Sequence, residues 1–306
     1  MPNLFSMVLK KNILGLKNQN NTNVLFKRIS GGKNIIKKKM KKTILAFSII
    51  LTVLVSCKSS RTKTSEVIEE TFFSSSLNEE RKLKIYFPKE FDSKKKYPVV
   101  YATDGQLIVE GYKKELDSYI NDGTLTPLII VGVYSNEKEV KNTVFEYRNF
   151  EYLRGLGDGS ELNDLYHKHR IFFLDEVKEY IESKYHISSS SRIFYGFSNG
   201  ADFGYEILLN NCSDFDSYLL YSLTGSNRKQ GDKYEKKCKS KVFISYGTSE
   251  NESLRENLLR IEDSLKANDY HIQVEVYDGG HKRTDWKKQF FKDMLKINSN
   301  NSCTTF

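Results

Sequence analysis

The chain has 306 residues, of which 39% are hydrophobic and 28% charged, with only four prolines and four cysteines. This composition is typical of a globular protein and excludes collagen-like, disulfide-dense and low-complexity classes. The net charge of +9 is misleading, because residues 1–56 hold 11 of the 48 basic side chains and none of the 39 acidic ones. The remainder is slightly acidic, so the sequence predicts no nucleic-acid partner.

The N-terminal segment has the layout of a secretory signal. Lysines at 37–39, 41 and 42 precede a mainly apolar run from Ile44 to Val55. The run is well short of the roughly 20 residues that a helix needs to cross a bilayer. Because 39 residues without any acidic side chain precede Met40, we predict that Met40 is the true start and that residues 1–39 are a non-native extension.

The residues that end this run, Leu54-Val55-Ser56-Cys57, resemble the bacterial lipoprotein box, whose cysteine is lipidated and becomes the first mature residue. The resemblance implies a lipoprotein signal peptide over 40–56 and a lipidated Cys57 with a polar tether over 57–65. It further implies export and lipid anchoring to a bacterial membrane, at the periplasmic face or the cell surface. An ordinary signal peptide with an incidental cysteine is the alternative.

Three cysteines remain downstream, Cys212, Cys238 and Cys303. In an oxidising compartment Cys212 and Cys238 are candidates for a disulfide, although buried free cysteines are equally common. The spacing of cysteines and histidines matches no metal-binding motif, so we expect neither a metal nor another cofactor.

A folded domain is expected over 66–298, followed by a polar tail over 299–306. Strands are predicted at 67–73, 82–87, 97–101, 127–134, 192–196, 218–223, 241–246 and 272–277, and helices at 110–120, 162–184, 201–209, 253–267 and 284–297. This alternation predicts a single α/β domain with a mostly parallel central sheet and helices on both faces. The irregular segment 135–170 between a strand and a helix is either a specificity-determining insertion or a plain surface loop.

Gly196-Phe197-Ser198-Asn199-Gly200 fits the G-x-S-x-G pattern and lies between a predicted strand and a predicted helix. This is the context of a nucleophile elbow, in which small residues allow a sharp turn that projects the serine. Ser198 is therefore the predicted nucleophile.

A serine hydroxyl needs a base to take its proton and a carboxylate to orient that base. Only His271 and His281 follow Ser198, and His281 stands just beyond a strand, where α/β ligand sites lie, so it is the predicted base. Glu250, just beyond the strand at 241–246, is the predicted acid and completes the order Ser, acid, His. Glu252 is the alternative acid.

Four ordered segments, 95–105, 192–207, 246–250 and 279–286, resemble the putative esterase family of α/β-hydrolases, the esterase D and enterochelin esterase-like group. The resemblance covers about Leu83 to Lys296. It implies an α/β-hydrolase fold and a serine esterase that works through an acyl-enzyme without a cofactor.

By this resemblance the oxyanion hole would use the backbone N–H groups of Asn199 and Gln106. The stretch from Arg148 to Tyr152 resembles the family's Arg-x-x-acid-aromatic segment, which makes Arg148 and Tyr152 candidate substrate-binding residues. An ion pair between Arg148 and Glu151, three residues apart, is the alternative reading and the one we favour.

The sequence therefore predicts a membrane-anchored serine carboxylic-ester hydrolase acting on a small-molecule or glycan-linked ester. Catecholate siderophore esters are preferred, because Arg148, Tyr152, Arg154 and Tyr166 would form a basic, aromatic pocket in the insertion. Feruloyl or acetyl esters of polysaccharides, or acyl transfer, are alternatives within the family. A non-catalytic ligand-binding lipoprotein with a hydrolase fold is the alternative of another class.

Overall fold

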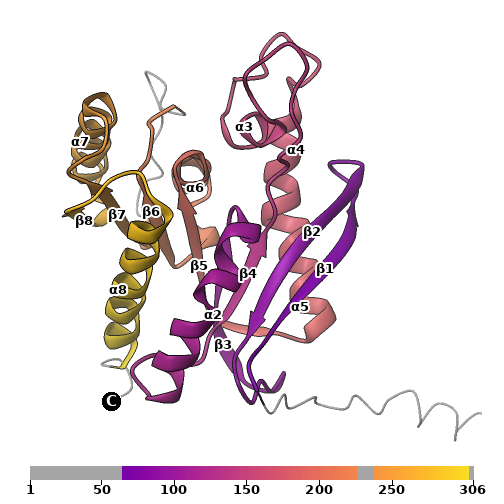
Figure 1. The fold of residues 1–306 in the computed structure, drawn as a ribbon, viewed down its shortest axis with the longest axis vertical. Coiled ribbons are helices and arrows are strands. Elements are labelled where there is room, and N and C mark those ends of the chain that lie inside the picture. Colours follow the sequence, from indigo (N-terminus) through magenta and orange to yellow (C-terminus); the bar gives the residue numbers. More distant parts are fainter. Residues whose placement is uncertain (1–63, 227–237, 303–306) are drawn as a thin grey trace, which may run out of the picture. The chain divides into compact units, whose positions relative to one another are not determined.

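An eight-stranded sheet forms the centre of the described part of the chain, residues 64–226 and 238–302 of a computed structural model (Figure 1). Its strand order is β1-β2-β4-β3-β5-β6-β7-β8. The β1–β2 and β2–β4 pairs are antiparallel, whereas every pair from β4 to β8 is parallel. The predicted α/β-hydrolase fold with a mostly parallel sheet is confirmed. The predicted extension, the signal peptide and Cys57 lie outside the described residues.

All eight predicted strands form close to the expected positions. They are β1 (Glu66–Ser74), β2 (Glu79–Phe87), β3 (Lys96–Ala102), β4 (Ile129–Val133), β5 (Ser188–Phe197), β6 (Ser217–Tyr221), β7 (Lys241–Gly247) and β8 (His271–Tyr277). The helices are α2 (Gly105–Asn121), α3 (Tyr147–Tyr152), α4 (Leu165–Ile171), α5 (Val177–Tyr185), α6 (Asn199–Asn210), α7 (Glu252–Ala267) and α8 (Arg283–Ser302), with a π-helical turn η1 (Phe172–Glu176) and a 3₁₀ turn η2 (Cys212–Asp214).

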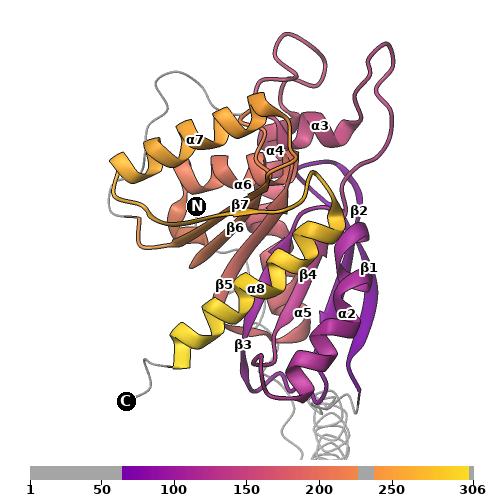
Figure 2. The same ribbon diagram turned by 60° about the vertical axis from the view of Figure 1, so that its left-hand side comes forward.

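Two apolar layers cover the two faces of the sheet. Helices α2 and α8 cover one face, through Ile108, Tyr112, Phe290 and other residues (Figure 2). Helices α5, α6 and α7, together with η1, cover the other face. Strands β3, β4, β6 and β7, and the second half of β5, read as nearly continuous apolar runs because both of their faces are buried.

The insertion after β4 differs from its prediction in two ways. The helix predicted over 162–184 begins at Leu165 and is interrupted by the π-helical turn, which buries Phe172 and Phe173. The short helix α3 was not predicted, because six residues are too few for a helical pattern to be read.

The disulfide suggested for Cys212 and Cys238 is wrong for this structure. Both side chains are buried, and the structure has each of them as a thiol. A buried cysteine packs as a small apolar side chain, so burial alone accounts for both positions. Within the described ranges no helix is both long and apolar enough to cross a membrane.

Candidate active site

The predicted catalytic residues come together at the carboxyl ends of the parallel strands. Ser198 directly follows β5, Glu250 follows β7 and His281 follows β8, while the loop from Asp104 to Gln106 follows β3. Parallel strands end at one edge of the sheet, and ligand sites in α/β proteins lie at that edge. Chain topology therefore gathers residues that are far apart in the sequence.

Ser198 occupies a strained turn between β5 and α6. Its backbone dihedrals are φ 53° and ψ −132°, a conformation that non-glycine residues rarely adopt. A Cβ on Gly196 would lie 2.4 Å from the Gly200 carbonyl oxygen, and a Cβ on Gly200 would lie 2.3 Å from Thr103 Oγ1. Glycine is therefore required at both positions, and the turn presents the half-buried Ser198 at the head of α6.

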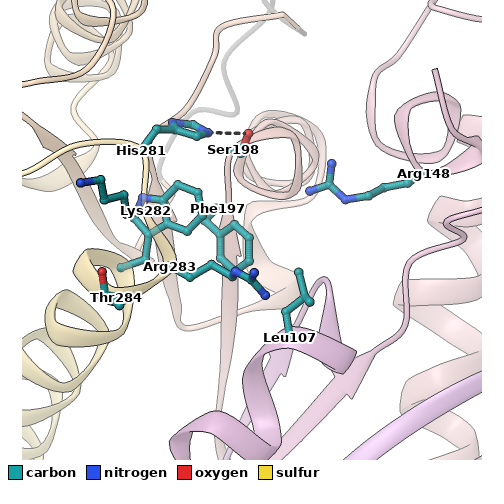
Figure 3. A pocket seen from close by; sticks show the side chains of 9 residues that line it. Leu107, Arg148, Phe197, Ser198, His281, Lys282, Arg283 and Thr284 are labelled. Atoms are coloured by element: carbon teal, nitrogen blue, oxygen red, sulfur yellow. Dashed lines mark hydrogen bonds between the residues drawn. The ribbon is translucent and has the colours of Figure 1, made fainter. Parts of the chain in front are cut away.

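A chain of hydrogen bonds joins the three predicted residues. His281 Nε2 lies 3.0 Å from Ser198 Oγ (Figure 3). His281 Nδ1 lies 3.0 Å from Glu250 Oε2. The Glu250 carboxylate can only accept, so Nδ1 carries the hydrogen and Nε2 is left to accept from the serine hydroxyl. The imidazole thus has the tautomer that a general base needs.

Glu250 is buried and its carboxylate accepts several hydrogen bonds. Burial raises the pKa of Glu250, but hydrogen bonds from His281, Ser222 and the Gly247 N–H outweigh this effect and hold the pKa below its usual value. Glu252 is exposed in the first turn of α7. The structure therefore places Glu250, and not Glu252, against His281.

The two predicted oxyanion donors both lie in the first turn of a helix. Asn199 is the first residue of α6 and Gln106 is the second residue of α2. N–H groups at these positions have no intrahelical acceptor. The side chain of Gln106 is turned to Ser135 and Glu137, so only its backbone can serve the site.

The ion pair favoured for Arg148 and Glu151 is wrong. Arg148 instead binds Asp104 through both oxygens, Nε to Oδ1 at 2.6 Å and Nη2 to Oδ2 at 2.8 Å. Glu151 is fully buried and pairs with Arg81 of β2 at 2.5 and 3.1 Å. Two ion pairs thus connect the insertion to the sheet. Arg148 connects it to Asp104, which follows β3, and Glu151 connects it to Arg81 of β2.

Of the four residues expected to form a basic, aromatic pocket, only Arg148 lines the cavity at Ser198. Tyr152 is buried beneath the Arg148 guanidinium, and its hydroxyl accepts a hydrogen bond from the Asp104 N–H, so its predicted contact with substrate is wrong. Tyr166 is also buried, and Arg154 pairs with Glu206 at 3.1 Å. These side chains pack the insertion against α6 and the core.

The cavity at Ser198 has a volume of about 680 Å³. Its lining is apolar and cationic, with Leu107, Phe197 and Trp286 beside Arg148, Lys282 and Arg283. Figure 3 shows the Arg148 guanidinium pointing toward Ser198 and the Arg283 guanidinium lying near Leu107. Arg148 is neutralised by Asp104, whereas Arg283 has no acidic partner within the part of the chain that the structure describes.

A second cavity of about 1180 Å³ lies within the insertion. Tyr147 and Phe150 of α3 line it, together with the loop segments 139–145 and 156–162. Arg148 lines the first cavity, so the short helix α3 forms a wall of both.

Sequence reasoning missed Ser222, Lys282 and Arg283 as parts of the site. Ser222 gave no signal, because the strand predicted over 218–223 included it and no motif surrounds it, whereas in the structure β6 ends at Tyr221. The two cations are neighbours of the predicted base, and their charge alone does not distinguish a pocket from a solvated surface. Across residues 64–226 and 238–302, no three potential metal ligands of the His, Cys, Asp or Glu type cluster together.

Comparisons with solved structures agree with this architecture. The chain is similar to a ferulic acid esterase, with 20% identity and a TM-score of 0.63 over 78% of this chain and 99% of the other. It is similar to the siderophore hydrolase EstB from Aspergillus nidulans, with 18% identity and a TM-score of 0.59 over 79% and 97%. It also resembles the enterobactin esterase FES from Shigella flexneri, with 14% identity and a TM-score of 0.59 over 79% and 61%.

At these identities the likeness establishes the fold. The family is established by the model described as "Putative esterase", which matches residues 74–297 and so covers the elbow, the acid turn and the histidine loop. The chain therefore belongs to the putative esterase family of ester hydrolases.

Proposed function

We propose that the protein is a serine carboxylic-ester hydrolase in which Ser198 is the nucleophile, His281 the general base and Glu250 the residue that orients His281. The observation that carries this proposal is the unbroken hydrogen-bonded series from Ser198 through His281 to the buried Glu250. Membership of the esterase family supports the same reaction class.

The geometry supports the following reaction course. His281 Nε2 takes the Ser198 proton as Oγ attacks the ester carbonyl carbon, and the carbonyl oxygen becomes an oxyanion facing the Asn199 and Gln106 N–H groups. Collapse breaks the ester C–O bond, and His281 protonates the departing alcohol. Water then attacks the acyl-enzyme, gives its proton to His281 and releases the carboxylic acid with regeneration of Ser198.

We propose catecholate siderophore esters as the substrate class. The support is the apolar wall of Leu107, Phe197 and Trp286, which suits aromatic rings, and the cation of Arg283 at the same cavity, which has no acidic partner among the described residues and suits an anionic ligand. The siderophore hydrolase and the enterobactin esterase among the similar structures point the same way.

Feruloyl or acetyl esters of polysaccharides are the second candidate. The observation that favours them is the pairing of Arg148 with Asp104, which removes one cation from the cavity, together with the likeness to a ferulic acid esterase. Side-by-side hydrolysis of a triscatecholate ester and a feruloylated glycan distinguishes the two. Release of ferulate without cleavage of the catecholate overturns the siderophore assignment.

The nucleophile is tested by labelling the full-length protein with a fluorophosphonate and locating the adduct by mass spectrometry, with p-nitrophenyl acetate as a turnover substrate. We expect the label on Ser198, and a loss of turnover of at least about 1,000-fold in Ser198→Ala. Ser190→Ala, at the other end of β5, is the matched control and should behave as wild type. A folded protein that takes no label would favour the non-catalytic binding lipoprotein.

Acyl transfer uses the same acyl-enzyme and differs only in the group that resolves it. Adding an alcohol acceptor to the p-nitrophenyl acetate assay tests this alternative. Hydrolysis predicts acetate as the product, whereas an acetylated alcohol in excess of acetate would identify a transferase.

We also propose that the mature protein is exported and lipid-anchored through Cys57. The support is the resemblance of residues 54–57 to a lipoprotein box, together with the lysine-rich stretch and the apolar run that precede this box. Metabolic labelling with an alkyne-modified palmitate should tag the wild type and not Cys57→Ser. A processed protein that begins at Cys57 but takes no label would contradict the anchor, and a precursor that begins at Met1 would contradict the start at Met40.

A further inference from the structure

A buried hydrogen-bond chain continues beyond Glu250 on the side away from His281. Ser222 Oγ donates to Glu250 Oε1, and Trp286 Nε1 donates to Ser222 Oγ at 2.7 Å. Ser222 is completely buried and Trp286 almost so. The two carboxylate oxygens of Glu250 thus have separate partners, since Oε2 faces His281.

The direction of each donation in this chain is fixed by chemistry. An indole N–H only donates, so the Ser222 oxygen is its acceptor and the Ser222 hydrogen is directed to Glu250. Glu250 Oε1 also accepts the Gly247 N–H at 3.0 Å. Two donors on Oε1 hold the carboxylate plane, and this aims Oε2 at Nδ1 of His281.

The backbone of Ser222 is held in a conformation that is strained for a non-glycine residue, and this fixes the position of its hydroxyl. Ser222 has φ 52°, in the left-handed region, and its N–H donates to a β7 carbonyl oxygen at 2.8 Å. Trp286 is fixed on its other side, because its ring stacks on Phe197 with the centroids 4.3 Å apart and also meets the His281 ring edge-on.

We propose that Ser222 and Trp286 are positioning residues for the Glu250–His281 pair, with Trp286 acting through Ser222. This inference rests on the proposed hydrolase function. Ser222 orients the carboxylate and stabilises its negative charge, and the Trp286 N–H fixes the Ser222 hydroxyl and so prevents its hydrogen from turning away.

Ser222→Gly separates this role from a structural one. Glycine adopts φ 52° without strain, which offsets part of the stability lost with the buried hydroxyl, so the variant should still fold while lacking that group. We expect kcat for p-nitrophenyl acetate to fall about 10- to 100-fold with KM unchanged, because a buried hydrogen bond to a charged group is lost. Ser245→Ala is the matched control, since the buried Ser245 hydroxyl has no hydrogen-bond partner among the described residues.

Combining variants tests whether the effect passes through Glu250. In a Glu250→Gln background Ser222→Gly should change kcat by less than about twofold, because the charged partner is already gone. Trp286→Phe keeps a ring against Phe197 and removes the N–H, so we expect about a 3- to 10-fold loss of kcat that disappears in the Ser222→Gly background.

Two outcomes would overturn the inference: wild-type kcat in Ser222→Gly, or losses that multiply independently in the double variants. A wild-type protein without Ser198-dependent turnover would instead contradict the proposed function itself. The two failures are thus distinguishable in one set of assays.

Discussion

The active-site corner and the insertion after β4 are built in different ways. At the corner, Ser198, Glu250 and His281 lie one, three and four residues beyond the ends of their strands, and the sheet brings them together. In the insertion, Arg148 binds Asp104 and Glu151 binds Arg81, pairs separated by 44 and 70 residues in the sequence. Strand ends position the first region, whereas long-range ion pairs hold the second.

We expect substitutions in the two regions to affect different quantities, kcat in the first and the free energy of unfolding in the second. Corner residues are held by backbone geometry, so replacing a catalytic side chain removes chemistry and leaves the fold. Insertion residues include buried charges, and removing one partner leaves the other uncompensated, which destabilises the protein. The expected effects therefore divide between kcat and the free energy of unfolding.

The largest expected effect is that of Glu250→Gln, which should lower kcat by about 1,000- to 10,000-fold, because the amide no longer fixes the His281 tautomer. The thermal midpoint should change little. Hydrolysis of p-nitrophenyl acetate and a melting curve measure the two quantities. Glu252→Gln, two residues away and exposed, is the control and should retain wild-type kcat; equal losses in both variants would contradict the assignment of the acid.

Arg81→Ala should lower the free energy of unfolding by about 3–5 kcal/mol, because it leaves the fully buried Glu151 carboxylate without its cationic partner. Chemical denaturation with urea measures this loss. The control is Arg260→Ala, which removes an exposed pair with Glu256 and should change the free energy of unfolding by less than about 1 kcal/mol. The double variant Arg81→Met/Glu151→Leu should recover much of the loss, and a double variant no better than Arg81→Ala would count against a charge-based cause.

Arg148→Lys tests the point where the two regions meet. Lysine cannot reproduce the two-oxygen contact with Asp104, which immediately precedes the first turn of α2, where Gln106 lies. We expect about a 10-fold loss in kcat/KM with a small change in stability. Lys138→Ala, an exposed change in the same insertion, is the control. A loss of stability without a loss of kcat/KM would show that the contact serves the insertion alone.

The smallest expected effect is in the pH dependence of stability. The pKa of Glu250 is lowered in the folded protein, so its ionised form contributes stability that is fully present above the unfolded value near 4.5 and is lost as pH falls through the lower folded value. Relative to Glu250→Gln, the wild type should lose stability as the pH falls below the unfolded value near 4.5. Parallel melting temperatures of the two proteins below that value would contradict the shift.

The sheet and the reacting residues were readable because each rests on a local pattern. Alternating or continuous runs of apolar, β-branched and aromatic residues predicted the strands, and a serine between glycines at a strand–helix junction predicted the elbow. The partners of Arg148 and Glu151 could not be predicted from the sequence, because nothing in the sequence around a charged residue indicates which distant residue it pairs with. Nearness along the chain favoured the wrong pair, and burial against β2 and the β3 loop decided the actual ones.

Ser222 shows a second limit of sequence reasoning. A single serine after a strand has no distinguishing neighbours, and its role depends on the positions of Glu250 and Trp286, which come from later parts of the chain. Tyr152 shows the converse. An aromatic residue beside an arginine suggested a substrate contact, yet its ring is the buried surface on which the arginine rests.

The contact between Arg148 and Asp104 limits how the insertion can diverge. The insertion is bound through Arg148 to Asp104, the residue just before the first turn of α2, where the proposed oxyanion donor Gln106 lies, so we expect a change of length near α3 to shift that turn as well. Exchange of this insertion between relatives therefore requires that the arginine and the aspartate be transferred as a unit. If the insertion sets the proposed specificity, a redesign of its substrate preference must therefore keep or rebuild this contact to preserve turnover.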